Sequence, residues 1–139
     1  MIDTVIAMAA RPKWWHILQA SRREALLAVD LCNRAASERS LEAFIVHMSL
    51  AWLYLHHARF ERDGVDYRYR DGDGRRFVRV DGEIKRWELA RCLREAFSDE
   101  RSPMRANVDF FVKVRNEIEH RYERLLAVAL AGARHRATP

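Results

Sequence analysis

The C-terminal third of the chain contains a long stretch without helix breakers, and this most constrains the fold. After Pro103, the next glycine or proline is Gly132. Ser102 and Pro103 form a helix start, because serine is a favoured N-cap and proline suits the first helical position. Apolar residues then recur at helical spacing: Phe111, Val114, Ile118 and Leu125. The sequence therefore predicts one long helix from Pro103 to about Leu130.

Three further segments also have helical periodicity. Residues 13–34 carry one apolar stripe, and residues 87–97 carry another on a shorter helix. Between them, a helix with Ser40 as N-cap is rich in large apolar side chains and should fade near Asp63 and Gly64. We expect this helix to lie at the centre of the core. The prediction is a mainly all-α bundle of about four helices, forming one domain over residues 1–139 with frayed tails at 1–12 and 131–139.

Residues 65–82 interrupt the helical pattern. Apolar and polar side chains alternate on both sides of the turn sequence Asp71–Gly74, which predicts a β-hairpin insert. Arg68 and Arg70 alternate there with tyrosines, an arrangement that could bind single-stranded RNA. The alternative is a hairpin whose tyrosines pack against the bundle while its arginines face solvent.

Composition excludes several classes of protein. Hydrophobic residues make up 49% and charged residues 32%, and no uncharged apolar run is long enough to cross a membrane. The opening residues lack a basic region before their apolar stretch, and the two cysteines, Cys32 and Cys92, lie far apart. We expect a soluble cytoplasmic protein without a disulfide framework. No zinc-ligand spacing occurs, and Arg75 replaces an oxygen ligand in the Asp-Gly-Asp-Gly turn, so neither a metal nor a cofactor is expected.

The formal net charge of +5 is carried almost entirely by arginine, since the chain contains only three lysines. Guanidinium groups suit phosphate recognition and stack on bases, which favours RNA as a partner. Codon bias in a GC-rich genome explains the same composition equally well.

A polar cluster lies in the middle of the long predicted helix, in the sequence Val-Arg-Asn-Glu-Ile-Glu-His-Arg-Tyr that ends at Tyr122. Asn116 and His120, four residues apart, should share one face. Arg115 and His120, five residues apart, should lie about 140° apart around the helix axis. Another surface would have to complete a site between them. A homodimer that pairs this helix with its copy would bring both groups into one cleft.

Such a cleft could cleave RNA without a metal. The imidazole of His120 can take a proton from a ribose 2′-hydroxyl or give one to a leaving 5′-oxygen. Arg115 can hold the phosphate and stabilise its developing charge, while Asn116 orients His120 or the substrate. Arg121 and Tyr122 are then candidate substrate contacts. The ordinary alternative is an exposed helix decorated with ion pairs between residues four apart, which carry no catalytic meaning.

The motif Arg115-Asn116-x-x-x-His120 resembles the Arg-x4-His motif of the HEPN superfamily. A longer ordered set of motifs, from about Ser21 to Tyr122, resembles a bacterial branch known as domain of unknown function 3644. This set comprises Glu24-Ala-Leu-Leu-Ala with Asn33, Leu41-Glu-Ala-Phe-Ile-Val with Ala51-Trp52, and the cluster at 114–122. The resemblance implies a HEPN-like dimeric bundle, often a ribonuclease of toxin–antitoxin or antiviral systems, with Arg115 and His120 as the catalytic pair.

Tyr122 completes the pattern Arg-x4-His-x-Tyr, which is similar to toxins neutralised by an antitoxin that adenylylates that tyrosine. The resemblance thus implies a possible antitoxin partner acting on Tyr122. Members of the branch usually continue beyond the motif helix, so this chain is expected to be an excised domain or a short form. Two alternatives to an enzyme remain: a non-catalytic module of a larger defence protein that binds RNA or nucleotide or dimerises, and a scaffold with neither activity.

Overall fold

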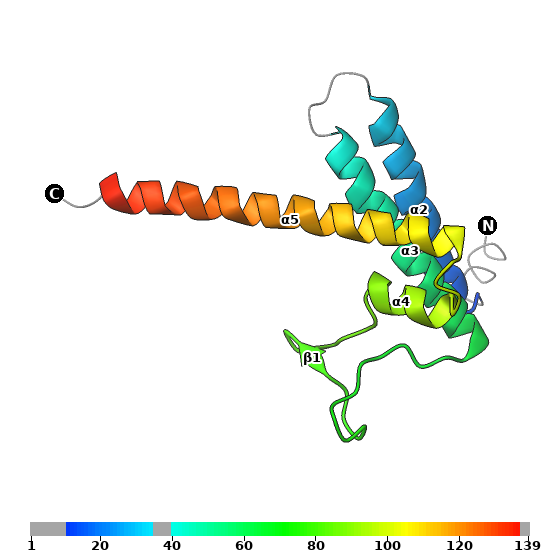
Figure 1. The fold of residues 1–139 in the computed structure, drawn as a ribbon. Coiled ribbons are helices and arrows are strands. Elements are labelled where there is room, and N and C mark those ends of the chain that lie inside the picture. Colours follow the sequence, from blue (N-terminus) through cyan, green and yellow to red (C-terminus); the bar gives the residue numbers. More distant parts are fainter. Residues whose placement is uncertain (1–10, 35–39, 137–139) are drawn as a thin grey trace, which may run out of the picture.

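The computed structural model describes residues 11–34 and 40–136; residues 1–10, 35–39 and 137–139 lie outside the described parts. Within these parts, the fold is mainly helical with one small antiparallel hairpin, as predicted (Figure 1). The helices are α2 (Lys13–Asn33), α3 (Ser40–Asp63), α4 (Leu89–Ala96) and α5 (Pro103–Arg136), and the strands are β1 (Arg79–Val80) and β2 (Glu83–Ile84). Along the described residues, no helix combines the length and apolarity that crossing a bilayer requires.

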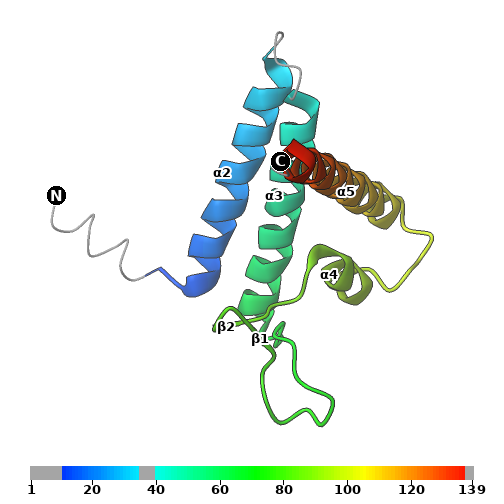
Figure 2. The same cartoon turned by 90° about the vertical axis from the view of Figure 1, so that its left-hand side faces the viewer.

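Helices α2 and α3 lie side by side as a helical hairpin (Figures 1 and 2). Small residues on the facing sides allow a close approach: Ala28 is fully buried, and the hydroxyl of Ser21 donates a hydrogen bond of 2.7 Å to the Ala51 carbonyl. A half-buried pair between His47 Nδ1 and Glu24 Oε2, 2.6 Å apart, also joins the two helices. The hairpin is thus a compact support for the remaining elements.

The core lies where α3 meets α4 and the first part of α5. One buried cluster joins Leu89 and Leu93 of α4 to Val108 of α5, and Leu53 of α3 packs against it. A second buried cluster comprises Phe60, Tyr67 and Cys92, and Leu53 packs against this one as well. Helix α3 therefore contributes to both clusters, which confirms the prediction that it lies at the centre.

Helix α5 begins as predicted and continues further. The backbone N–H of Arg105 donates to the Ser102 hydroxyl at 3.4 Å, so Ser102 caps the helix ahead of Pro103. The predicted end near Leu130 is wrong, because α5 continues through Gly132 to Arg136. One glycine costs a helix only about 1 kcal/mol relative to alanine, which an otherwise favourable run tolerates. The tail expected at 131–139 is thus helical to Arg136.

The insert between α3 and α4 departs in detail from the simple predicted hairpin. The turn at Asp71–Gly74 forms, with an isolated bridge between Arg70 and Phe77. The regular ladder lies further along, between β1 and β2, around a tight turn where Asp81 and Gly82 have positive φ angles of 50° and 83°. Such two-residue turns match the twist of paired strands. The pairing also extends beyond the predicted boundary at residue 82, because the N–H of Trp87 donates to the Tyr67 carbonyl at 2.8 Å.

Candidate functional site

Arg115 and Asn116, in the middle of α5, line a cavity of about 570 Å³. Helices α3, α4 and α5 and the end of the insert enclose it. Its apolar wall is formed by Leu50, Leu53, Leu89, Ala90 and Val112. The volume lies within the range of pockets that hold small organic groups. Arg115 and Asn116 thus line a cavity that has an apolar wall and polar side chains beside it.

The guanidinium of Arg115 is only partly engaged. Its Nη2 lies 2.7 Å from Glu119 Oε1, one turn further along α5, and 40% of the side chain is exposed. Its Nε atom is buried and has no hydrogen-bond partner among the described residues. A guanidinium carries five N–H donors in a fixed fork, so donors remain for an anion that enters the cavity.

His57 lines the same cavity, and the sequence did not single it out as a site residue. Its Nε2 donates to the Trp87 carbonyl at 2.8 Å, and its ring stacks on Tyr67 with centroids 4.6 Å apart. Burial lowers the pKa of His57, and the charge of Arg86 acts in the same direction against the hydrogen bond to Trp87. Near neutral pH the ring is therefore uncharged, with Nδ1 as its acceptor nitrogen. No local spacing could reveal this, since Trp87 is 30 residues away.

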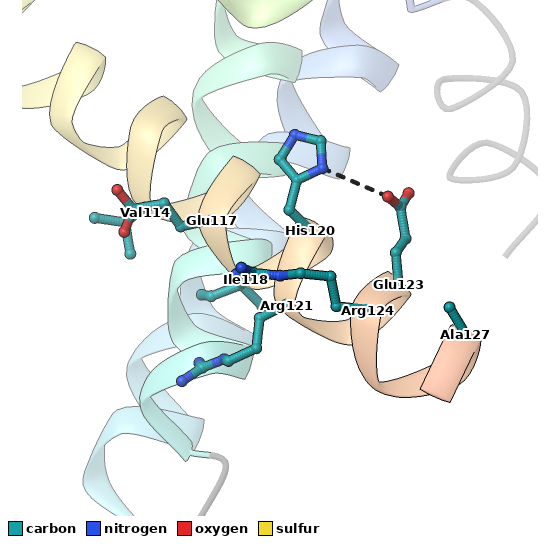
Figure 3. Close-up of a pocket in the computed structure, with 8 residues that line it drawn as sticks. All are labelled: Val114, Glu117, Ile118, His120, Arg121, Glu123, Arg124 and Ala127. Atoms are coloured by element: carbon teal, nitrogen blue, oxygen red, sulfur yellow. Dashed lines mark ion pairs between the residues drawn. The ribbon is translucent and has the colours of Figure 1, made fainter. Parts of the chain in front are cut away.

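His120 lies on another side of α5. It borders an open hollow of about 870 Å³ whose described lining residues all belong to α5, among them Arg121, Glu123 and Arg124 (Figure 3). The imidazole is 74% exposed, and its Nδ1 lies 3.4 Å from Glu123 Oε2. The pair lies within ion-pair distance and is not a hydrogen bond, but a carboxylate on this side favours the tautomer with its proton on Nδ1, which leaves Nε2 as the basic nitrogen. Glu123 was not singled out from the sequence, although its spacing of three residues from His120 was visible there.

The side chains of Arg121 and Tyr122, in the outer part of α5, have different surroundings. The Arg121 guanidinium pairs with Glu42 near the start of α3, and in Figure 3 it projects away from the imidazole of His120. Tyr122 is 61% exposed and lines neither of the two hollows. Arg121 thus links α5 to α3, while the Tyr122 side chain is exposed.

The motif is therefore divided within one protomer. Arg115 and Asn116 line one hollow, and His120 and Arg121 line the other. Asn116 was expected to share a face with His120, but the structure groups it with Arg115 at the cavity. The separation of Arg115 from His120 follows from their 140° offset around the helix. One chain by itself does not gather these groups around a single point.

Arg68 and Arg70 lie on the insert and are occupied there. Their guanidinium carbons lie 4.2 and 4.4 Å from the centroid of the Phe77 ring, and both side chains pair with Asp66. Hydrogen bonds from both arginines hold the pKa of the Asp66 carboxyl well below its usual range. Tyr67 is buried, as in the alternative hairpin with packed tyrosines. The insert instead reaches the Arg115 cavity through Arg86 and Trp87.

Among the described residues, no group of three or more histidine, cysteine, aspartate and glutamate side chains is placed to hold a metal ion. The polar groups that gather near the motif include guanidinium, amide and imidazole side chains, together with the carboxylates of Glu88, Glu117, Glu119 and Glu123. This set can bind an anion and move protons.

No curated protein matches this chain. No solved structure matches it either. The family model described as a domain of unknown function, DUF3644, matches residues 16–136, which is most of the chain. The chain therefore belongs to the DUF3644 family.

Proposed function

We propose that this protein is a metal-independent endoribonuclease of the HEPN type that works as a homodimer. The observation that carries the proposal is the placement of Arg115 and His120 on two sides of α5, in a helix whose outer half has little cover. Each protomer displays an anion-binding guanidinium and an acid–base imidazole, with the two groups turned apart. When two such helices face each other, the guanidinium of one and the imidazole of the other can act on the same phosphodiester.

The outer half of α5 offers a surface for that pairing. Tyr122, Leu125 and Val128 are 61%, 63% and 72% exposed. Large apolar side chains that gather on one exposed segment are typical of interaction surfaces. A second copy is the occupant that fits, because a two-fold axis brings the His120 side of one helix toward the Arg115 side of its partner. RNA then crosses the groove between the two helices.

The chemistry needs few groups. The imidazole of His120, with Glu123 near its Nδ1, takes the proton of the ribose 2′-hydroxyl through Nε2. The 2′-oxygen attacks phosphorus, the bond from phosphorus to the 5′-oxygen breaks, and the departing oxygen takes a proton from water. Arg115 of the facing helix stabilises the charge on the phosphoryl oxygens, and Asn116 binds the substrate beside it. The products are a 2′,3′-cyclic phosphate and a 5′-hydroxyl.

Cleavage of a labelled 20-nucleotide RNA in EDTA tests the proposal. We expect fragments that end in a cyclic phosphate, and no cleavage of a matched strand with 2′-deoxyribose at every position. His120→Ala and Arg115→Lys should each reduce the rate at least about 100-fold, since general base and charge stabilisation contribute this much or more. His16→Ala, which removes an exposed imidazole on α2, is the matched control. Equal cleavage by the wild type and both motif variants would indicate a contaminant and end the proposal.

A non-catalytic module that binds RNA or nucleotide, or dimerises, is the second candidate. It is favoured by the ion pair between Arg115 and Glu119, which already engages Nη2 of the guanidinium that the ribonuclease proposal assigns to the phosphate. This candidate predicts salt-dependent RNA binding with no product after long incubation. A pure scaffold predicts neither binding nor cleavage, and a dimer unaffected by Arg115→Ala.

The proposed setting is a toxin or antiviral defence system in the cytoplasm, as the HEPN resemblance implies. An antitoxin that modifies Tyr122 fits the exposure of its side chain. Mass spectrometry of the protein purified with the products of its neighbouring genes tests this, because an adenylylated Tyr122 has a characteristic added mass.

A further inference from the structure

A third, smaller cavity lies away from the motif. It measures about 330 Å³ and lies between α2, α3, the segment that follows α4 and the first turn of α5. It shares no lining residue with the Arg115 cavity or with the His120 hollow. Three aromatic side chains, Trp14, Trp52 and Phe97, form much of its wall. This volume is at the lower end of the range for ligand pockets and suits a molecule of one or two fused rings.

His56 forms part of the same wall as a flat, uncharged ring. It is 3% exposed and stacks with Trp52 and Phe60 at centroid distances of 6.2 Å to each. Neither ring nitrogen has a hydrogen-bond partner among the described residues. Burial, assisted by the charges of Arg59 and His57, lowers the pKa of His56 to about 4. Near neutral pH the wall therefore presents aromatic faces without a charge of its own.

The charge at the cavity is concentrated in two arginines. Arg59 and Arg62, one turn apart on α3, both contribute to the lining. They share a single carboxylate, because the Nε atoms of Arg59 and Arg62 lie 3.7 and 3.0 Å from oxygens of Asp63. Two guanidinium groups with one counter-charge leave an excess positive charge beside the aromatic wall. Leu55 and Met104, 40% and 50% exposed, also line the cavity and leave it open to solvent.

We propose that this cavity binds a small planar aromatic anion, such as a bicyclic aryl carboxylate. The ring system lies among Trp14, Trp52 and Phe97, where apolar area is removed from water. The carboxylate lies toward Arg59 and Arg62, where it meets charge-assisted donors. This site is independent of the proposed ribonuclease activity and shares no residue with it.

Titration of the full chain with 1-naphthoate, followed by ¹⁵N–¹H NMR of the tryptophan indoles, tests the proposal. The signals of Trp14 and Trp52 should shift in a saturable way. Trp15 and Trp87, which do not line the cavity, are internal controls. The neutral 1-naphthalenemethanol should bind at least about threefold more weakly, because it lacks the charge that meets the guanidinium groups.

Variants at the arginine end sharpen the test. Arg62→Gln should weaken naphthoate binding about threefold to tenfold, and Asp63→Asn should strengthen it by freeing both guanidinium groups. Arg75→Gln, an equal loss of charge on the distant insert turn, should leave binding unchanged. Met104→Trp, at a half-exposed position, should block entry without disturbing the core.

Several results overturn the proposal. The first is the absence of a Trp14 or Trp52 shift at 2 mM naphthoate, roughly the upper limit of affinities that identify a site. If the alcohol bound as tightly as naphthoate, or if Arg62→Gln and Arg75→Gln had equal effects, the site would have no preference for an anion. If the cavity instead accommodates an apolar side chain of a protein partner, naphthoate should cause no saturable shift, and the proposal would be wrong.

Discussion

The two halves of α5 share one helix and differ in almost everything else. In the first half, Val108 is 1% exposed and packs against Leu89 and Leu93 of α4. In the second half, Val128 is 72% exposed, and Arg121 pairs across to Glu42 of α3. The first half packs against the bundle, whereas the second half presents polar and apolar groups to solvent. The motif spans the border, with Arg115 at the packed side and His120 at the open side.

The largest expected effect concerns the proposed division of labour between two copies. Arg115→Ala and His120→Ala should each lose at least about 100-fold in cleavage rate. Mixed and allowed to exchange, the two inactive variants should recover about a quarter of the wild-type rate, since half of the dimers are mixed and each has one intact site of two. The measurement is cleavage before and after mixing. No recovery, despite exchange shown by mass spectrometry, would mean that each site takes both groups from one chain.

The next effect compares one substitution in both halves. Val108→Ala should reduce the free energy of unfolding by about 2 kcal/mol, because it removes buried methyl groups and leaves a cavity. Val128→Ala is the matched change in the exposed half and should cost less than about 0.5 kcal/mol in the monomer. Urea unfolding at low protein concentration measures both. If Val128→Ala reduced the free energy of unfolding as much as Val108→Ala at low protein concentration, the outer half of α5 would be packed in the monomer, and the two halves would not differ as described.

A pH effect of similar size is expected from the packed region. The pKa of His56 is about 4 in the folded protein, below its ordinary value of 6.5. Between these two pH values, His56 is therefore mostly protonated in the unfolded chain and mostly neutral in the folded chain. The free energy of unfolding should therefore fall by about 2 kcal/mol as the pH drops from 6.5 to 4, and level off below that. The pKa of His57 is lowered too, which acts in the same direction.

His56→Leu isolates this contribution. The variant should be at least as stable as the wild type at pH 7, because it removes two buried nitrogens that have no hydrogen-bond partner within the described part of the chain. It should also lose most of the fall between pH 6.5 and 4, as measured by urea unfolding across that range. His120→Leu, at an exposed position, serves as the control and should keep the fall. If the free energy of unfolding of His56→Leu fell as much as that of the wild type between pH 6.5 and 4, groups other than His56 would be responsible.

The smallest expected effect concerns the ion pair that links the exposed half to α3. Arg121→Ala should cost about 0.5 kcal/mol, as for other exposed pairs, and less in high salt. The double variant with Glu42→Ala should cost no more than the two single changes together, and thermal unfolding in low and high salt measures the difference. A loss of several kcal/mol would show that α5 depends on this contact for its position.

The helical elements were largely predictable because each carries local signals. Ser102 and Pro103 mark the start of α5, and the apolar stripe of α3 follows from its spacing. The pairing in the insert was harder to predict, since the turn at Asp71 competes with the tighter turn at Asp81 and Gly82. Choosing between them depends on contacts such as the hydrogen bond from Trp87 to Tyr67, which no local pattern encodes.

The candidate site shows the same limit. Arg115, Asn116 and His120 stand out from the sequence because polar side chains in mid-helix contradict simple propensity. Their helical spacing alone determined that Arg115 and His120 face apart. Only the tertiary structure decided what each of them faces, because cavities and buried imidazoles arise where distant segments meet: Arg115 shares a hollow with His57, and His56 lies in the wall of another. A residue's place on its own helix depends on local geometry, whereas its neighbours depend on how the helices pack.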